Sequence, residues 1–183
     1  MKKIFLDCGA NSGQSVRRFM KDFTDWEEFE IHCFEPNTGF EKSIKEMGAI
    51  FHGEAVSVED GETKFFIGIS DLSSTITLEK YVNISDKSII VRTLDFSLWI
   101  QKNFNKEDYI IVKLNIEGAE YDLLEKMIKD RTFEWIDIIY IEFHGHKMHP
   151  NMSGKNKELV REIESFGTKY IYWMEKFTLN EVH

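Results

Sequence analysis

Residues 3–13 read KIFLDCGANSG, and this stretch decides the fold of the 183-residue chain. Lys3 to Cys8 is a short apolar run that predicts a buried strand. Gly9 and Gly13 then predict a tight turn, because glycine adopts left-handed backbone conformations at little cost. Apolar residues follow at helical spacing from Val16 to Phe23, which predicts a helix. A strand, a glycine loop and a helix in this order are typical of the first unit of an α/β fold.

The alternation of strands and helices continues along the chain. The pattern predicts further strands at 30–35, 49–57, 109–115 and 136–143, and helices around 40–47, 96–100, 124–128 and 159–166. The hydrophobic run 109–115 is expected near the centre of the sheet. The turn signal at 59–62 predicts an antiparallel hairpin with a strand over 63–69. The polar stretch 71–88 has no assigned element, and residues 170–182 are expected to form one or two short strands.

These elements predict an α/β fold with a mostly parallel twisted sheet, helices on both faces and an antiparallel hairpin addition. Asp95 is placed to cap the helix that follows it. Because no linker or composition shift divides the chain, we expect a single domain over residues 1–183.

Composition and charge narrow the class of protein. With 42% hydrophobic and 30% charged residues, the chain has the composition of an ordinary globular domain. Its net charge of −9 repels nucleic-acid phosphates, and no apolar run approaches the roughly 18 residues that a membrane span needs. We therefore expect a cytoplasmic protein with neither nucleic acid nor membrane as a partner. Cys8 and Cys33 lie in apolar runs without metal-ligand spacing, so both are expected to be reduced and buried.

Two acidic residues at the ends of predicted strands indicate the kind of ligand. Asp7 is placed to accept hydrogen bonds from the cationic end of a ligand, while Gly9 and Gly13 let the backbone approach it closely. Glu35 ends the second strand, where a carboxylate can bind both hydroxyls of a ribose. A dinucleotide site would instead show G-x-G-x-x-G. The alternative is purely structural: a tight glycine turn, with Glu35 capping the next helix through Pro36-Asn37.

With these residues in view, the chain resembles the FkbM-type family of class I S-adenosylmethionine methyltransferases over roughly residues 4–167. Residues 5–13 are similar to the family's D-x-G-A-N-x-G signature, and 33–37 to its F-E-P motif. Lys113 to Glu120 resembles the K-x-D-x-E-G-A-E block, and 141–144 the ending of its fifth strand. Weaker middle motifs fall at 55–57 with 60–61, at 73–74 and at 92–95. One departure is Asn115, which stands where the family usually has aspartate and which cannot take a proton.

The resemblance implies a Rossmann-like class I methyltransferase fold and S-adenosylmethionine as the cofactor. We expect the ribose on Glu35, the methionine end near residues 7–13, and the adenine against Ala55-Val56 or Ser73-Ser74. The expected cofactor-binding residues are Asp7, Gly9, Ala10, Asn11, Ser12, Gly13, Glu35, Pro36, Ala55, Val56, Ser73 and Asn115.

For the reaction, the enzyme must align the acceptor and remove a proton from a hydroxyl. The candidate catalytic residues are His144, which we favour as the base, then Glu117 and Glu142, with Asn115 on the substrate side. The alternative for His144 is a histidine that closes a strand, and the alternative for Glu117 is the first turn of a helix. Lys113 is expected either in a structural ion pair or on the substrate. The histidines at 144, 146 and 149 lie in a predicted loop, so we expect no metal site.

The resulting hypothesis is an O-methyltransferase acting on a hydroxyl of a sugar, glycan or other small metabolite. Two alternatives stay open: a non-catalytic S-adenosylmethionine-binding module, which Asn115 makes conceivable, and an NAD-type oxidoreductase, which the spacing of the glycine loop opposes. The sequence identifies neither the acceptor nor the oligomeric state.

Overall fold

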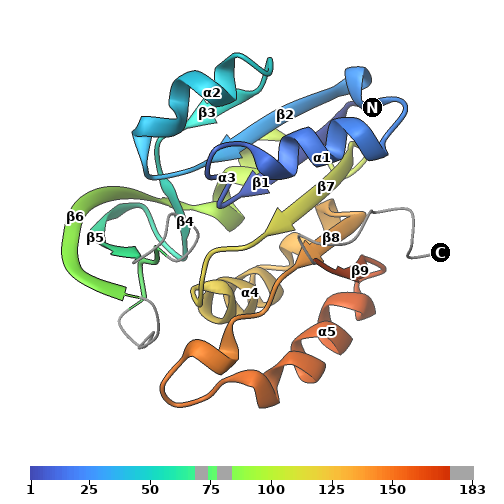
Figure 1. Cartoon of the computed structure of the whole chain (residues 1–183). Helices are drawn as coiled ribbons and strands as arrows, with labels where there is room; N and C mark the ends of the chain where they lie inside the picture. The colour runs from blue at the N-terminus through green and yellow to red at the C-terminus, as the bar shows by residue number, and fades with distance from the viewer. Residues whose placement is uncertain (69–73, 78–83, 174–183) are drawn as a thin grey trace.

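The computed structural model describes residues 1–68, 74–77 and 84–173. Its centre is a six-stranded sheet in the order β3-β2-β1-β7-β8-β9, and every neighbouring pair is parallel (Figure 1). The chain therefore fills the sheet outward from β1 in one direction and then, from β7, in the other, which is a Rossmann-like topology. The strands are β1 (Lys3–Cys8), β2 (Phe29–Phe34), β3 (Ile50–His52), β7 (Tyr109–Leu114), β8 (Ile138–Ile141) and β9 (Lys169–Tyr172).

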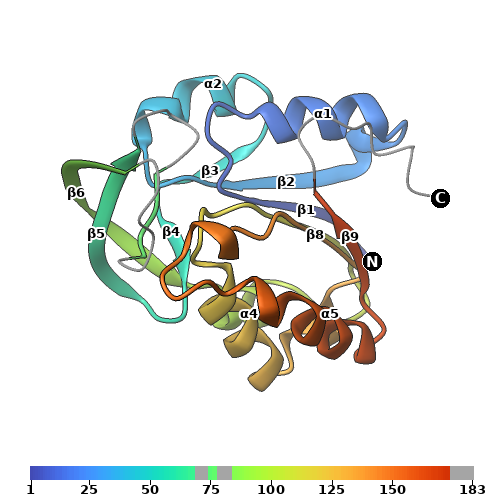
Figure 2. The same ribbon diagram turned by 60° about the horizontal axis from the view of Figure 1, so that its bottom comes forward.

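Helices cover both faces of this sheet, as predicted. Figure 2 shows α1 (Gln14–Asp22) and α2 (Glu41–Lys45) on one side, and α4 (Glu120–Lys129) and α5 (Asn156–Ser165) on the other. Helix α3 (Phe96–Asn103) shares a hydrophobic core with α4 and α5. The predicted mostly parallel α/β architecture is thus confirmed.

The central strands are buried on both faces, which explains their nearly continuous apolar sequences. Strand β1 lies between β2 and β7, with Phe5 opposite Ile111. The predicted central position of the strand at 109–115 is confirmed. On the α1 face, the rings of Phe5 and Phe19 stack with centroids 4.1 Å apart. Each such buried side chain stabilises the fold by about 1.5–3 kcal/mol relative to an exposed one.

A second, three-stranded sheet lies beside the first in the order β4-β6-β5 (Figure 1, at the left). It consists of β4 (Ala55–Ser57), β5 (Gly61–Gly68) and β6 (Ile84–Asp95). The single strand predicted over 49–57 is wrong, because β3 and β4 belong to different sheets.

The antiparallel addition is present, but its partner strand differs from the predicted hairpin. Strand β5 pairs antiparallel with β6, for example Phe65 with Ile89, whereas β4 pairs parallel with β6. Part of the stretch 71–88 that the sequence left unassigned therefore belongs to β6. Pairing with a strand so distant in the chain gives no local signal, whereas a two-residue turn does.

Short elements complete the fold. Asp95 caps α3 as predicted, since its Oδ1 accepts a hydrogen bond from the backbone N–H of Leu98 at 3.0 Å. Of the strands expected over 170–182, β9 accounts for the beginning, and residues 174–183 lie outside the described part of the chain. No helix in the described residues is long and apolar enough to cross a membrane. The 3₁₀ helices are Trp26–Glu28, Thr38–Phe40, Thr132–Trp135, Gly145–Lys147 and Ser153–Lys155.

Candidate active site

A cavity of about 570 Å³ opens at the carboxyl ends of the parallel strands. It lies where the strand order reverses between β1 and β7, which is where α/β sheets bind their ligands. Its size suits a nucleotide-sized molecule. The predicted site residues that line it are Gly9, Ala10, Asn11, Glu35, Pro36, Ala55, Val56, Asn115, Glu117 and Glu142.

The glycine loop packs closely against neighbouring segments of the chain. Gly9 has φ +77°, and a Cβ there would lie 2.0 Å from the carbonyl oxygen of Asn115. Gly13 has φ +81°, and its Cβ would lie 2.0 Å from Cε of Met47. The backbone N–H groups of Gly9 and Ala10 both donate to the carbonyl of Phe34, at 3.0 and 3.2 Å. Packing against the backbone therefore requires glycine at position 9, whereas at position 13 the left-handed φ is the main constraint, because the end of the Met47 side chain can move.

Asp7 lies behind this loop and does not meet the cavity directly. Its side chain is fully buried, and its Oδ1 lies 3.0 Å from Nζ of Lys113. Its other oxygen accepts a hydrogen bond from the hydroxyl of Ser15 at the start of α1. Lys113 also donates to the carbonyl of Gly9 at 2.9 Å. Asp7 is thus not among the described residues that line the cavity, where it was expected to meet the ligand. Lys113 forms the structural ion pair that was one of its two expected states, and it also lines the cavity.

Glu35 lies on the cavity wall at the end of β2, and only 6% of its surface is exposed. Its Oε2 accepts from the N–H of Asn11 at 2.9 Å, and its Oε1 accepts from the N–H of Asn37 at 2.8 Å. Burial raises the pKa of Glu35, although the hydrogen bonds from Asn37 and Asn11 oppose this rise. Both amides hold the carboxylate in one orientation, and each oxygen keeps acceptor capacity for a hydroxyl.

The apolar side of the cavity comes from the second sheet. Ala55 and Val56 of β4, which the sequence placed at the site, line the cavity. Phe65 and Ile67 of β5 line it as well. The sequence interpretation missed these two residues, although they lie in the predicted strand over 63–69. Ser74 also lines the cavity, and Ser73 lies outside the described residues. Ser12 and Gly13 are not among the described residues that line it.

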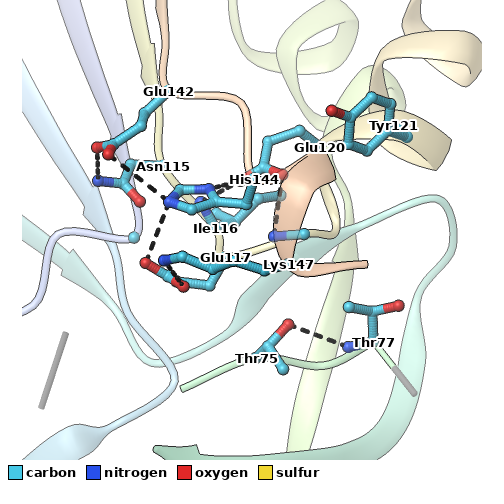
Figure 3. Close-up of polar contacts among 12 residues, drawn as sticks. Thr75, Thr77, Asn115, Ile116, Glu117, Glu120, Tyr121, Glu142, His144 and Lys147 are labelled. Carbon is cyan, nitrogen blue, oxygen red and sulfur yellow. Dashed lines mark hydrogen bonds and ion pairs between the residues drawn. The ribbon is translucent and has the colours of Figure 1, made fainter. Parts of the chain in front are cut away.

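On the other side, four residues form what we call the acid–histidine cluster: Glu117, Glu120, Glu142 and His144 (Figure 3). His144 is 1% exposed and lies between the three carboxylates. Its Nδ1 lies 2.9 Å from Oε1 of Glu120, and its Nε2 lies 3.2 Å from Oε1 of Glu117 and 3.8 Å from Oε1 of Glu142. Glu117 and Glu142 line the cavity, whereas His144 and Glu120 lie behind them.

Glu120 is the member of this cluster to which sequence reasoning gave no role. It is fully buried at the start of α4, and its two oxygens accept from the N–H groups of Ile116 at 3.0 Å and Gly118 at 2.9 Å. It therefore fixes both the loop before α4 and the ring of His144. Glu117 lies before α4 and has φ +57°. It is therefore not in the first turn of the helix, which was the structural alternative for this residue. Such a left-handed backbone at a non-glycine residue is often found at functional sites.

The charge state of His144 follows from these contacts. Burial alone would lower the pKa of His144, but the hydrogen bonds with Glu117 and Glu120 outweigh it and raise the pKa to about 9. At neutral pH the ring is therefore an imidazolium, which cannot accept a proton. The structure thus places an imidazolium behind the cavity wall, between three carboxylates, and the catalytic role expected for His144 stays a prediction.

The two acids on the wall have further partners. Nδ2 of Asn115 donates to Oε2 of Glu142 at 2.8 Å, and Nζ of Lys147 donates to Oε2 of Glu117 at 2.9 Å (Figure 3). Glu117 is thus held by two cationic groups and Glu142 by a neutral amide at close range. Within the described residues, no group of three His, Cys, Asp or Glu side chains is arranged to hold a metal ion.

The strand order and the cavity at its reversal define a Rossmann-like α/β protein with a cavity at the carboxyl edge of the sheet. Within that class, the chain belongs to the FkbM methyltransferase family, because the family model described as the methyltransferase FkbM domain matches residues 7–170 of 183. It is therefore a methyltransferase by family, and the predicted family is confirmed. No curated protein and no solved structure matches the chain significantly.

Proposed function

We propose that this protein transfers the methyl group of S-adenosylmethionine to a hydroxyl of a sugar, glycan or other small metabolite. One observation carries the cofactor part of this proposal: the buried carboxylate of Glu35, oriented by two backbone amides, on the wall of a 570 Å³ cavity at the reversal of the strand order. A carboxylate in this place suits the two hydroxyls of a ribose. The family membership supports the reaction.

The remaining lining residues fit the other parts of the cofactor. Ala55, Val56, Phe65 and Ile67 offer an apolar surface for the adenine. Residues 9–11 line the same cavity, and their backbone would hold the methionine portion. When bound, S-adenosylmethionine supplies a methyl group on a positively charged sulfur, so the protein mainly has to align the acceptor and receive its proton.

Among the candidate bases, the contacts favour Glu142. His144 is protonated at neutral pH, because its pKa is raised to about 9 by Glu117 and Glu120 against the effect of burial. Glu117 contacts the cations His144 and Lys147, which stabilise its charged form and weaken it as a base. Glu142 accepts from the neutral amide of Asn115 and lies farther from His144, at 3.8 Å. We therefore assign the proton of the acceptor hydroxyl to Glu142 and the binding of a neighbouring hydroxyl to Glu117.

The same residues limit the class of acceptor. Glu117 and Glu142 place two carboxylates on the acceptor side of the cavity. Carboxylates accept hydrogen bonds from hydroxyls and repel phosphates and other carboxylates. A neutral hydroxylated acceptor therefore fits better than an anionic one, and the net charge of −9 argues against nucleic acid. Asn115 does not remove the base from the site, because it orients Glu142 rather than acting as a base itself.

The test is the affinity of the Glu35→Gln variant for S-adenosylhomocysteine, measured by calorimetric titration. Loss of a charge-assisted hydrogen bond costs about 1.5–3 kcal/mol, so we expect Kd to rise about 10- to 150-fold. Glu46→Gln is the matched control, because Glu46 is an exposed acid that does not line this cavity and whose carboxylate lies 3.9 Å from Nζ of Lys42. Unchanged affinity in Glu35→Gln would refute the ribose assignment.

The acceptor is tested by transfer of a labelled methyl group to panels of neutral and phosphorylated sugars. We expect label in the neutral hydroxylated compounds. Tight cofactor binding without transfer to any hydroxylated compound would instead favour the non-catalytic binding module.

A further inference from the structure

Lys147 brings a cation to the cavity wall beside the acid–histidine cluster. It is the last residue of the 3₁₀ helix Gly145–Lys147, and its Nζ donates to Oε2 of Glu117 at 2.9 Å. Figure 3 shows the side chain of Lys147 reaching the carboxylate of Glu117. An ammonium carries three N–H donors, and this contact uses one of them. Since the described residues supply no second partner for Nζ, Lys147 can also donate to a ligand in the cavity.

The loop that carries Lys147 is held by its own hydrogen bonds and by close packing against α4. The N–H of Lys147 donates to the carbonyl of His144 at 2.8 Å, and the N–H of Met152 donates to the carbonyl of Gly145 at 3.1 Å. A Cβ at Gly145 would lie 2.1 Å from the hydroxyl of the buried Tyr121. The ammonium therefore extends from a fixed backbone, which lowers the cost of ordering it around a ligand.

The charge of Lys147 is balanced by Glu117, at 2.9 Å. A cation without such a partner would favour phosphates and carboxylates as ligands. A cation that is paired with a carboxylate attracts anions much less and still offers its remaining N–H groups. The oxygen of a hydroxyl has two lone pairs and can accept a hydrogen bond from such a group. Lys147 is thus suited to a neutral, hydroxylated ligand.

Lys147 and Glu142, the proposed base, belong to one connected set of contacts. Glu117 and Glu142 both approach Nε2 of His144, at 3.2 and 3.8 Å, and Glu117 in turn contacts Lys147. Glu117, Glu142 and Lys147 all line the cavity. A ligand whose reacting hydroxyl meets Glu142 therefore has the ammonium of Lys147 on the same wall.

We infer that Lys147 donates a hydrogen bond to a second hydroxyl of the acceptor, so that the acceptor is a polyhydroxylated ring such as a sugar. This inference rests on the proposed function, because it takes the reacting hydroxyl to lie at Glu142. Lys147 is then a specificity-determining residue that binds the acceptor and not the cofactor. A site built to hydrogen-bond a hydroxyl rejects the analogue that lacks it, because the donor of the site is then left without its partner.

The test combines variants of Lys147 with acceptors that lack single hydroxyls. The acceptors are the methyl glycosides of glucose, galactose and mannose with their monodeoxy analogues, and kcat/KM is measured for methyl transfer from S-adenosylmethionine. For the wild type, we expect loss of one particular hydroxyl, distinct from the methylated one, to lower kcat/KM about 10- to 150-fold, as for a hydrogen bond to a charged group. Lys147→Met should lower kcat/KM for the parent sugar by a similar factor and should cause no further loss for that deoxy analogue.

Two further variants complete the comparison. Lys147→Arg keeps the charge and the N–H donors, so it should recover part of the activity that Lys147→Met loses. Lys155→Met is the matched control, because Lys155 also pairs with a glutamate, Glu125 at 2.7 Å, but does not line the cavity. This control should leave kcat/KM unchanged for every sugar.

Each outcome separates the inference from the proposed function. A wild-type protein that does not bind S-adenosylhomocysteine refutes both. Binding of S-adenosylhomocysteine without transfer to any of these sugars overturns the inference alone. The inference is also wrong if Lys147→Met lowers kcat/KM equally for the parent and every deoxy sugar, since Lys147 then only holds Glu117, or if Lys147→Met weakens S-adenosylhomocysteine itself. Thermal melting checks folding, and Lys147→Ala replaces Lys147→Met if that variant unfolds.

Discussion

His144 should make the stability of the fold depend on pH in the alkaline range. Its pKa in the folded protein is about 9, against an ordinary value of 6.5, because hydrogen bonds with Glu117 and Glu120 outweigh the opposing effect of burial. A raised pKa means that the stabilisation is complete below pH 6.5 and is lost as pH rises through about 9. At about 1.4 kcal/mol for each tenfold change in proton affinity, the difference between the two values is worth about 3 kcal/mol.

The perturbation is a pH series from 7 to 10, with thermal unfolding followed by circular dichroism. Most of that free energy is lost over this range, and for a chain of this size about 1 kcal/mol changes Tm by about 2–4 °C. We therefore expect Tm of the wild type to fall by about 5–10 °C. His144→Gln should be less stable at pH 7 and should show a flatter pH dependence up to pH 9. The reasoning is refuted if the two proteins lose stability in parallel, since other groups would then account for the slope.

Three further predictions concern the ion pair, the base and a second histidine site. Lys113→Met leaves Asp7 buried without its cation, so urea denaturation should show a loss of about 3–5 kcal/mol; the double variant with Asp7→Asn should recover part of it, and a loss below about 1 kcal/mol would contradict the buried pair. Glu142→Gln should reduce kcat about 10²- to 10⁴-fold with unchanged affinity for S-adenosylhomocysteine, and full activity would reject Glu142 as the base. Burial lowers the pKa of His52 to about 4, with a further contribution from His32. The unfolded chain therefore takes up a proton at this residue near pH 6.5 while the folded protein does not, so the folded protein loses stability as pH falls from 6.5 towards 4. His52→Phe should lose less stability than the wild type between pH 7 and 4.5 in urea titrations, and an equal loss would assign the acid sensitivity to other groups.

Local sequence patterns were sufficient for the frame of the fold. The glycine loop, the apolar run at 109–115 and the cap at Asp95 each depend on neighbours within a few residues, and each is where the pattern predicts it. The position of Glu35 on the cavity wall also follows from chain order alone, because the ends of parallel strands meet at one edge of the sheet.

Long-range contacts decided what the sequence could not show. Strand β6 pairs with two strands that lie far from it in the chain, so no turn sequence next to it predicts the pairing. Asp7 does not line the cavity, because its carboxylate pairs with Lys113, which is its register neighbour on a strand about a hundred residues later. The raised pKa of His144 has the same kind of origin: it depends on Glu120 and Glu117, whose approach requires the folded loop before α4.

The acid–histidine cluster also shows how a departure from a family pattern can be accommodated. A carboxylate at position 115 would face the carboxylate of Glu142 at the distance now spanned by a 2.8 Å hydrogen bond. Two carboxylates that close share a proton or require a cation. The amide of Asn115 replaces that repulsion with a hydrogen bond that orients Glu142.

The central claim is that the cavity binds S-adenosylmethionine through its adenosine, and side-by-side calorimetric titration of the wild-type protein tests it most directly. S-Adenosylhomocysteine and NADH are the two ligands, since both contain an adenosine and only NADH carries a pyrophosphate. We predict that S-adenosylhomocysteine binds at one site for each chain and that NADH does not bind. Binding of NADH alone would contradict the account.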